Sequence, residues 1–171
     1  MTVTRQDDKP WKTDLARKAS ERRELVAKEL EETIRKAPSF EEALRLAVET
    51  MKKRFARYAA VTAYVADGED LAVHIALERP QGPERVAAVG GPLADAGAVA
   101  NPTVVADLTA SPAWAAVGLA SGSAMVAPVR TDAGLWAILE VWSELHDAFS
   151  PQDAKVLGRV AQALARKTPA A

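Results

Sequence analysis

The chain of 171 residues contains no cysteine, and this absence removes whole classes of chemistry. Without thiols it cannot form disulfides, thiolate nucleophiles, iron–sulfur clusters or thiolate zinc sites. Histidine is scarce as well. His74 and His146 lie far apart on different predicted elements and do not have the spacing of metal ligands, so we predict no metal site.

Long hydrophobic runs and a strong net charge are also missing. No apolar stretch approaches the length of a membrane span, and the amino terminus lacks a signal-peptide pattern, which predicts a cytoplasmic protein without membrane contact. The formal net charge of -1 gives no general attraction to nucleic acid. Gly90-Gly91-Pro92 lacks the spacing of a phosphate-binding loop, and a turn explains it.

What remains is enough chain for one domain with a sizeable core. Residues 1–12 are polar and are predicted to form a flexible lead-in. Residues 13–37 are predicted to form a charged helix, in which acids precede bases by four residues. Residues 38–167 form the predicted domain, and residues 168–171 a disordered tail.

The apolar stripe of the 13–37 helix is thin, and its members are small or medium-sized: Leu15, Ala19, Val26, Leu30 and Ile34. A helix this charged needs a partner to persist in water. We expect a homodimer in which this helix supplies much of the interface, within a short helical bundle that includes the last helix. The alternative is a monomer in which the helix folds back on its own sheet.

The middle of the chain alternates between strong patterns and weak ones. Ser39-x-x-Glu42 is a capping box that opens a second helix with a broad apolar stripe. Residues 60–65 and 71–77 read as a β-hairpin around Asp67-Gly68. Residues 90–122 are rich in small residues and have weak periodicity, which indicates an irregular crossover.

The carboxy-terminal part has the clearest signals. Residues 123–130 and 135–143 are predicted strands joined by a tight turn at 131–134, and Ser150-Pro151-x-Asp153 starts a last helix. Short strands are also expected at 85–89 and 103–105. The order predicts an α+β fold, with a central antiparallel sheet of five to six strands, terminal helices packed on one face and an irregular crossover covering the other.

Three motifs in this region resemble the GAF domain family. They are Ser123-x-x-x-x-Pro128 in a strand, Gly134 before an apolar strand, and Ala148-Phe149-Ser150-x-x-Asp153 at the entry to the last helix. The resemblance covers residues 39–166 and is specific in 123–153. It implies a sensory or regulatory module that binds an unidentified small molecule and signals through dimerisation or a partner protein, with an unknown cofactor requirement.

This function has two alternatives. The first is a ligand-free structural or protein-interaction domain whose pocket is filled by its own side chains. The second is an enzyme, and we expect that the chain is not one, because it lacks a paired catalytic constellation. The branch of GAF-like proteins that reduces free methionine sulfoxide uses cysteines, and the bilin-bearing branch usually attaches its chromophore through one; this chain has neither route.

The resemblance also predicts where a ligand would bind. In residues 135–142 side chains alternate, so Leu135 and Leu139 are expected to face the helices, and Trp136, Glu140 and Trp142 the pocket. Glu140 either binds a ligand or is an exposed or salt-bridged carboxylate without one. The two tryptophans either stack on a ligand or pack in the core or rim.

Two further residues complete the predicted pocket wall. Asp107 follows a short strand before the crossover loop, and its carboxylate either binds a ligand amine or caps the local backbone. Trp114 follows Ser111-Pro112 and either covers the pocket or fills the gap beneath the loop.

Overall fold

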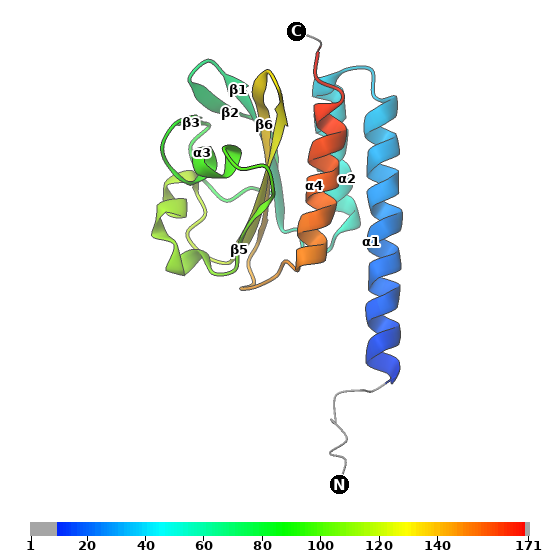
Figure 1. Ribbon diagram of the computed structural model, residues 1–171. Helices are drawn as coiled ribbons and strands as arrows, with labels where there is room; N and C mark the ends of the chain where they lie inside the picture. Colours follow the sequence, from blue (N-terminus) through cyan, green and yellow to red (C-terminus); the bar gives the residue numbers. More distant parts are fainter. Residues whose placement is uncertain (1–9, 170–171) are drawn as a thin grey trace.

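Six strands form one antiparallel sheet, with helices on one face and an irregular crossover on the other (Figure 1). The computed structural model describes residues 10–169. In the order β3-β2-β1-β6-β5-β4, the strands are Arg85–Ala87, Asp70–Leu77, Ala60–Asp67, Gly134–Ser143, Ser123–Thr131 and Thr103–Val105. This architecture confirms the predicted α+β fold.

Three helices form the layer on one face: α1 (Pro10–Lys36), α2 (Phe40–Arg54) and α4 (Pro151–Ala165). The Ser39 hydroxyl accepts a hydrogen bond from the Glu42 amide and so caps α2. Ser150 and Asp153 cap α4 reciprocally, each accepting a hydrogen bond from the other's backbone amide. Leu139 and Val141 of β6 lie in the core beneath these helices, as predicted.

Helix α1 divides into two parts. Val26, Leu30 and Ile34 are buried, and the helix contacts α2 and α4 of its own chain rather than the sheet. The carboxy-terminal half of the predicted apolar stripe is therefore buried within its own chain. From Pro10 to Arg22, in contrast, no side chain is buried, and Trp11 and Leu15 are each 57 % exposed.

The predicted ends of the chain lie partly outside the described residues. Of the flexible lead-in predicted at 1–12, residues 1–9 are outside, while α1 already begins at Pro10. Residues 170–171 of the predicted tail are outside as well. Between residues 10 and 169, no helix has both the length and the apolar character needed to cross a membrane.

The crossover on the other face contains α3 (Pro92–Gly97) and two short 3₁₀ helices, η1 (Leu108–Ala110) and η2 (Pro112–Val117). These two turns were not predicted, because single 3₁₀ turns have no apolar periodicity to detect. Side chains of the crossover pack with residues from β1, β5 and β6 in a second apolar cluster: Leu93, Leu108, Trp114, Val117, Leu119, Tyr64, Val126 and Ile138.

A β-bulge corrects the predicted faces at the start of β6. Arg130 pairs with Leu135 and Val129 with Ala137, so Trp136 has no partner on β5. The extra residue resets the alternation. Leu135 therefore packs with the crossover and Trp136 with the helices, where its ring lies edge-on to Phe40 with centroids 6.1 Å apart.

Candidate functional site

Glu140 of β6 is a buried carboxylate on the crossover face of the sheet, with 2 % of its surface exposed. Thr62 of β1 lies directly opposite it in the strand register. The hydroxyl of Tyr64, also on β1, donates to Glu140 Oε2 across a long 3.4 Å. Strand alternation places all three side chains on one face, next to the second apolar cluster.

Arg79 brings a positive charge to this polar group from the loop after β2. Its side chain is only 7 % exposed, and its guanidinium carbon lies 5.7 Å from the centre of the Tyr64 ring. Its Nη2 donates to the carbonyl of Pro83 at 2.5 Å. We call Thr62, Tyr64, Arg79 and Glu140 the buried polar cluster.

Burial changes the proton affinity of this cluster. Loss of hydration raises the pKa of Glu140 to about 7, and the charge of Arg79 and the Tyr64 hydrogen bond oppose this rise. Burial and the neighbouring carboxylate also raise the pKa of Tyr64. Glu140 can therefore exchange a proton near neutral pH, which exposed carboxylates do not do.

Two atoms of the cluster lack hydrogen-bond partners. Among the buried side-chain nitrogen and oxygen atoms of residues 10–169, only Thr62 Oγ1 and Arg79 Nε have no hydrogen-bond partner. Each such group costs about 1–3 kcal/mol of stability when it is removed from water without a partner. Their position beside Glu140 marks this part of the fold as one that is not arranged for stability alone.

The loop that carries Arg79 packs closely on the crossover. A side chain at Gly82 would place its Cβ 2.9 Å from the Val117 carbonyl oxygen, and one at Gly118 would place it 2.8 Å from the Gln81 oxygen. The loop begins at Glu78, whose φ of 56° is in the left-handed region. Residues 78–83 thus close over the crossover through backbone contacts.

The predicted site residues separate into three groups. Trp142 and Trp114 pack in the second apolar cluster on the face of Glu140, and the Trp142 indole donates to the Ser121 carbonyl at 2.8 Å. Trp136 lies on the opposite face, so its predicted position on the pocket wall is wrong. Asp107 caps η1, accepting from the amide of Thr109 at 2.9 Å, which is the capping role given above as its alternative.

Asp107 also lies close to one of the two histidines. Its Oδ1 is 3.6 Å from His146 Nε2, and the hydrogen bond from the Thr109 hydroxyl is the main cause that lowers its pKa. Between residues 10 and 169 no group of three or more potential metal-binding side chains comes together.

Sequence reasoning missed three members of the buried polar cluster. Thr62 and Tyr64 could have been found, because alternation in the strand 60–65 places them opposite Val61 and Ala63. Arg79 gave no such signal. It lies in a loop, where no periodicity indicates the direction of a side chain.

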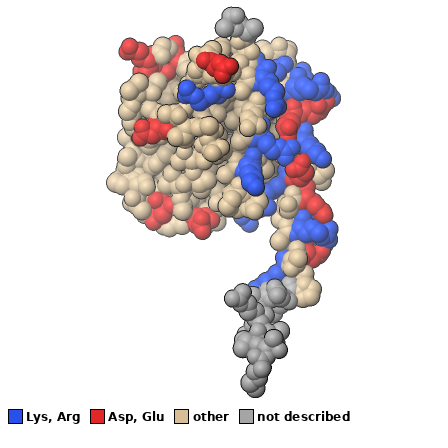
Figure 2. Space-filling view, viewed as in Figure 1, with Lys and Arg blue, Asp and Glu red and all other residues tan. Residues whose placement is uncertain are grey.

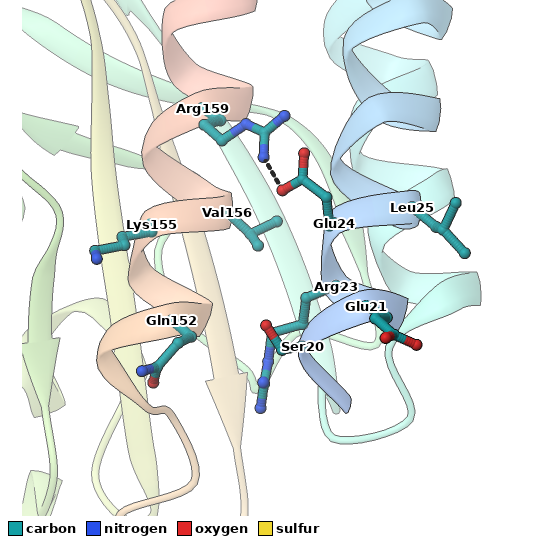
Figure 3. A pocket seen from close by; sticks show the side chains of 9 residues that line it. All are labelled: Ser20, Glu21, Arg23, Glu24, Leu25, Gln152, Lys155, Val156 and Arg159. Atoms are coloured by element: carbon teal, nitrogen blue, oxygen red, sulfur yellow. Dashed lines mark hydrogen bonds and ion pairs between the residues drawn. The ribbon is translucent and has the colours of Figure 1, made fainter. Parts of the chain in front are cut away.

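A second candidate region lies between α1 and α4, where a cavity of about 720 Å³ opens (Figure 3). Ion pairs cross it: Arg159 Nη1 binds Glu24 Oε2 at 2.6 Å, and Arg23 Nε binds Asp153 Oδ1 at 3.0 Å. Arg159 also pairs with Glu31. Because these charges satisfy one another, the paired residues hold α1 on α4.

Solved structures share this fold. A putative GAF sensor protein from Burkholderia vietnamiensis matches with a TM-score of 0.77 and 21% identity over 86% of this chain and 94% of that one. A free methionine-R-sulfoxide reductase from Neisseria meningitidis, solved with its substrate, matches with a TM-score of 0.73 and 24% identity over 83% of this chain and 85% of that one. The GAF domain of a phosphoenolpyruvate-protein phosphotransferase from Coxiella burnetii matches with a TM-score of 0.72 and 18% identity over 86% of this chain and 93% of that one.

The reductase overturns the expectation that the chain is not an enzyme. At these identities the likeness shows the fold alone, but several solved reductases of this kind share it, so the fold is one that supports catalysis. The expectation rested on the lack of cysteine and of a paired catalytic constellation in the sequence, and neither is decided by the fold.

No curated protein matches the chain significantly. The family model of the GAF domain, in contrast, matches residues 39–167, which is most of the chain. This range holds the sheet, α2, α4, the crossover and the whole buried polar cluster. The chain therefore belongs to the GAF domain family.

Proposed function

We propose that the chain is a sensory or regulatory module that binds a small polar molecule at the buried polar cluster. The observation that carries this proposal is the burial of Glu140 beside two polar atoms, Thr62 Oγ1 and Arg79 Nε, that have no partner. A ligand that supplies those partners would recover the free energy that their burial costs in the ligand-free chain.

The alternative, a structural domain with a self-filled pocket, has its own support. Apolar side chains of the crossover pack against the sheet, and none of the five cavities described between residues 10 and 169 is lined by Glu140. A self-filled pocket would nevertheless be more stable with apolar residues at positions 62, 79 and 140. This cost favours the ligand-binding function.

The cluster specifies the chemistry of the ligand. Glu140 accepts hydrogen bonds when ionised, whereas Arg79 Nε can only donate and Thr62 can do either. A matching molecule carries a donor or a cation for Glu140 and an acceptor for Arg79 within a few ångströms of each other. The need for an acceptor extends the expectation from the sequence, in which Glu140 alone set the ligand's chemistry.

Entry would require the Arg79 loop to move. Residues 78–83 are held against Val117 and Gly118 by backbone contacts and begin at a residue with strained φ. We propose that ligand binding displaces this loop and that the displacement is the signal passed to a partner protein or a second copy. Loop rearrangements accompany many regulatory binding events.

Native mass spectrometry of the purified full chain tests this function, together with thermal-shift titrations of small polar compounds that include free methionine-R-sulfoxide. We expect a bound compound whose affinity falls about ten-fold or more in Glu140→Gln, because a charged hydrogen bond is lost. The matched control is Glu144→Gln, an exposed carboxylate beyond the end of the same strand, which should bind normally. A compound that binds Glu140→Gln equally well would place the site elsewhere, and a chain that binds nothing would support the self-filled domain.

We also propose a homodimer, now through the exposed part of α1 alone. Because Val26, Leu30 and Ile34 are buried within the chain, the interface must use Pro10–Arg22, where Trp11 and Leu15 are exposed one turn apart. Two apolar side chains at this spacing can form the seam of a short helical pair. A cytoplasmic location stays a prediction.

Light scattering at micromolar concentration tests the dimer. The full chain should be dimeric, and Leu15→Glu should be monomeric with little change in melting temperature, because Leu15 is 57 % exposed in the single chain. Leu145→Glu, at an exposed leucine after β6, is the control and should remain dimeric. A monomeric parent chain, or a dimeric Leu15→Glu variant, would refute this interface.

A further inference from the structure

The helical layer stops short of one edge of the sheet. Helix α4 packs mainly on β5, and α2 on β1 and β2, whereas β4 makes its main contacts within residues 10–169 with β5. Val104 of β4 is the register partner of Met125, which lies in the core under the helices, so Val104 faces the same side. It is nevertheless 41 % exposed. An apolar strand face thus lies open beside α4.

A groove follows this uncovered edge. It has a volume of about 760 Å³, and its apolar lining includes Pro102, Val104, Phe149 and Gly158. A second groove of about 370 Å³ shares Pro102 and Gly158 with it and continues along α4 as far as Ala165. Together they run most of the length of α4, about 20 Å. We call them the α4–β4 groove.

Gly158 forms the floor of this groove, and the fold does not demand a glycine there. It lies inside α4, where glycine weakens a helix relative to alanine. A Cβ at this position would lie 3.4 Å from Pro102 Cγ, an ordinary van der Waals distance. The glycine therefore costs helix stability without relieving a clash, and its effect is to keep the groove deep.

The part of the groove that lies over β4 carries positive charge. Among residues 10–169, the larger cavity over β4 is lined by Lys155 and Arg159 and by no acid, whereas the smaller cavity is lined by both Arg130 and Asp132. Arg159 is paired with Glu24 and Glu31, whereas Lys155 makes no ion pair within residues 10–169. In Figure 3 the Lys155 side chain points away from α1, and Figure 2 shows cationic side chains over the helical layer, interleaved with acidic ones. An occupant of opposite charge would complement this rim.

From these observations we propose that the α4–β4 groove docks an acidic amphipathic helix of a partner protein. Its apolar residues, at spacings of three and four, would lie over Gly158, Pro102 and Val104, and its carboxylates would meet Lys155. A helix fits better than an added strand, because β4 has only three residues and offers about 10 Å of backbone. This surface lies on the face opposite Glu140 and does not depend on the proposed ligand.

A peptide display library tests the docking, with random peptides of about twenty residues, long enough to form a helix. Selection on the full chain, followed by removal of peptides that also bind Gly158→Leu, isolates groove-dependent binders. We expect acidic sequences with apolar residues at helical spacing, which become helical on binding. Their affinity should fall at least ten-fold in Lys155→Glu but not in Lys53→Glu, the control at an exposed lysine of α2.

A stability measurement keeps the proposal open to refutation if a variant misfolds. Gly158→Ala should raise the melting temperature by about 2 °C, because it improves α4 without a clash. A lower melting temperature would show that packing requires the glycine and would remove the argument for a groove. The proposal would also fail if no groove-dependent peptide appeared, if the selected peptides were basic or bound as strands, or if Gly158→Leu abolished dimerisation, since a second copy would then be the occupant.

Discussion

The two faces of the sheet bury side chains of different kinds, aliphatic ones on the helix face and several polar ones on the crossover face. On the helix face, aliphatic side chains of β6 such as Leu139 and Val141 pack beneath three helices. Charged groups on that side pair with one another around the core (Figure 2), and the buried carboxylate of Asp153 is paired with Arg23. On the crossover face the same strand carries Glu140 into an apolar surrounding, with Thr62 and Tyr64 beside it.

Within β6, the side chains on the helix face stabilise the fold, whereas Glu140 on the crossover face lowers its stability and is the candidate for function. A buried aliphatic residue stabilises the fold by about 1.5–3 kcal/mol, whereas a buried charge lowers its stability unless it is paired and hydrogen-bonded. Both unpartnered buried atoms described above belong to the crossover face. The fold bears the cost of unpartnered buried polar atoms on the crossover face, and this is the face that we assign to binding.

The largest effect should come from the helix face. Leu139→Ala is expected to lower the free energy of unfolding by about 2–5 kcal/mol, because Leu139 is fully buried between β6 and the helices. Chemical denaturation measures this change. Leu145→Ala, at an exposed leucine, should change it by less than about 0.5 kcal/mol. If Leu139→Ala were as mild as the control, the helix face would not be the core.

A pH-dependent effect should come from the crossover face. The pKa of Glu140 is raised to about 7 from an ordinary value of 4.5, so the folded chain holds a proton that the unfolded chain has released between those values. Stability from this group is therefore complete below about pH 4.5 and is lost as the pH rises through about 7. The loss is on the order of 3 kcal/mol.

Glu140→Gln isolates this dependence. The amide cannot ionise, so the difference in unfolding free energy between the variant and the parent chain should grow in favour of the variant from pH 5 to pH 7.5. Carboxylates elsewhere, such as Glu24 with its lowered pKa, contribute equally to both chains and cancel. Parallel stability curves for the two proteins would mean that Glu140 does not change its protonation on folding.

Much of the fold could be predicted because its signals are local. The capping residues Ser39 and Ser150 and the alternation through Leu139 and Val141 each depend on neighbours in sequence, and the structure confirms them. The bulge at Trp136 could not be seen, because it depends on the pairing of β6 with a second strand. One inserted residue reversed the faces of Leu135 and Trp136 and left Glu140 in phase.

The candidate site was predictable only in part for the same reason. Glu140 and Trp142 were assigned to the crossover face by alternation within their strand, and the structure places them there. The positive charge that favours the ionised form of Glu140 and so lowers its pKa comes from Arg79, in a loop far away in sequence. A contact of this kind is set by tertiary structure, so no spacing rule could find it.

The smallest effect sharpens the contrast between a satisfied ion pair and an incompletely satisfied polar cluster. Arg23 binds Asp153 at 3.0 Å and ties α1 to the start of α4, but Asp153 also accepts hydrogen bonds from the Ser150 amide at 2.8 Å and its hydroxyl at 2.9 Å. Arg23→Gln should therefore lower the free energy of unfolding by only about 1–2 kcal/mol, because the Asp153 carboxylate, although only 7 % exposed, keeps its two donors from Ser150. Chemical denaturation at low and high salt measures it, with Arg17→Gln on the exposed part of α1 as the control near zero. A loss as large as that of Leu139→Ala would show that the helix face also depends on a buried charge, and the distinction between the two faces would fail.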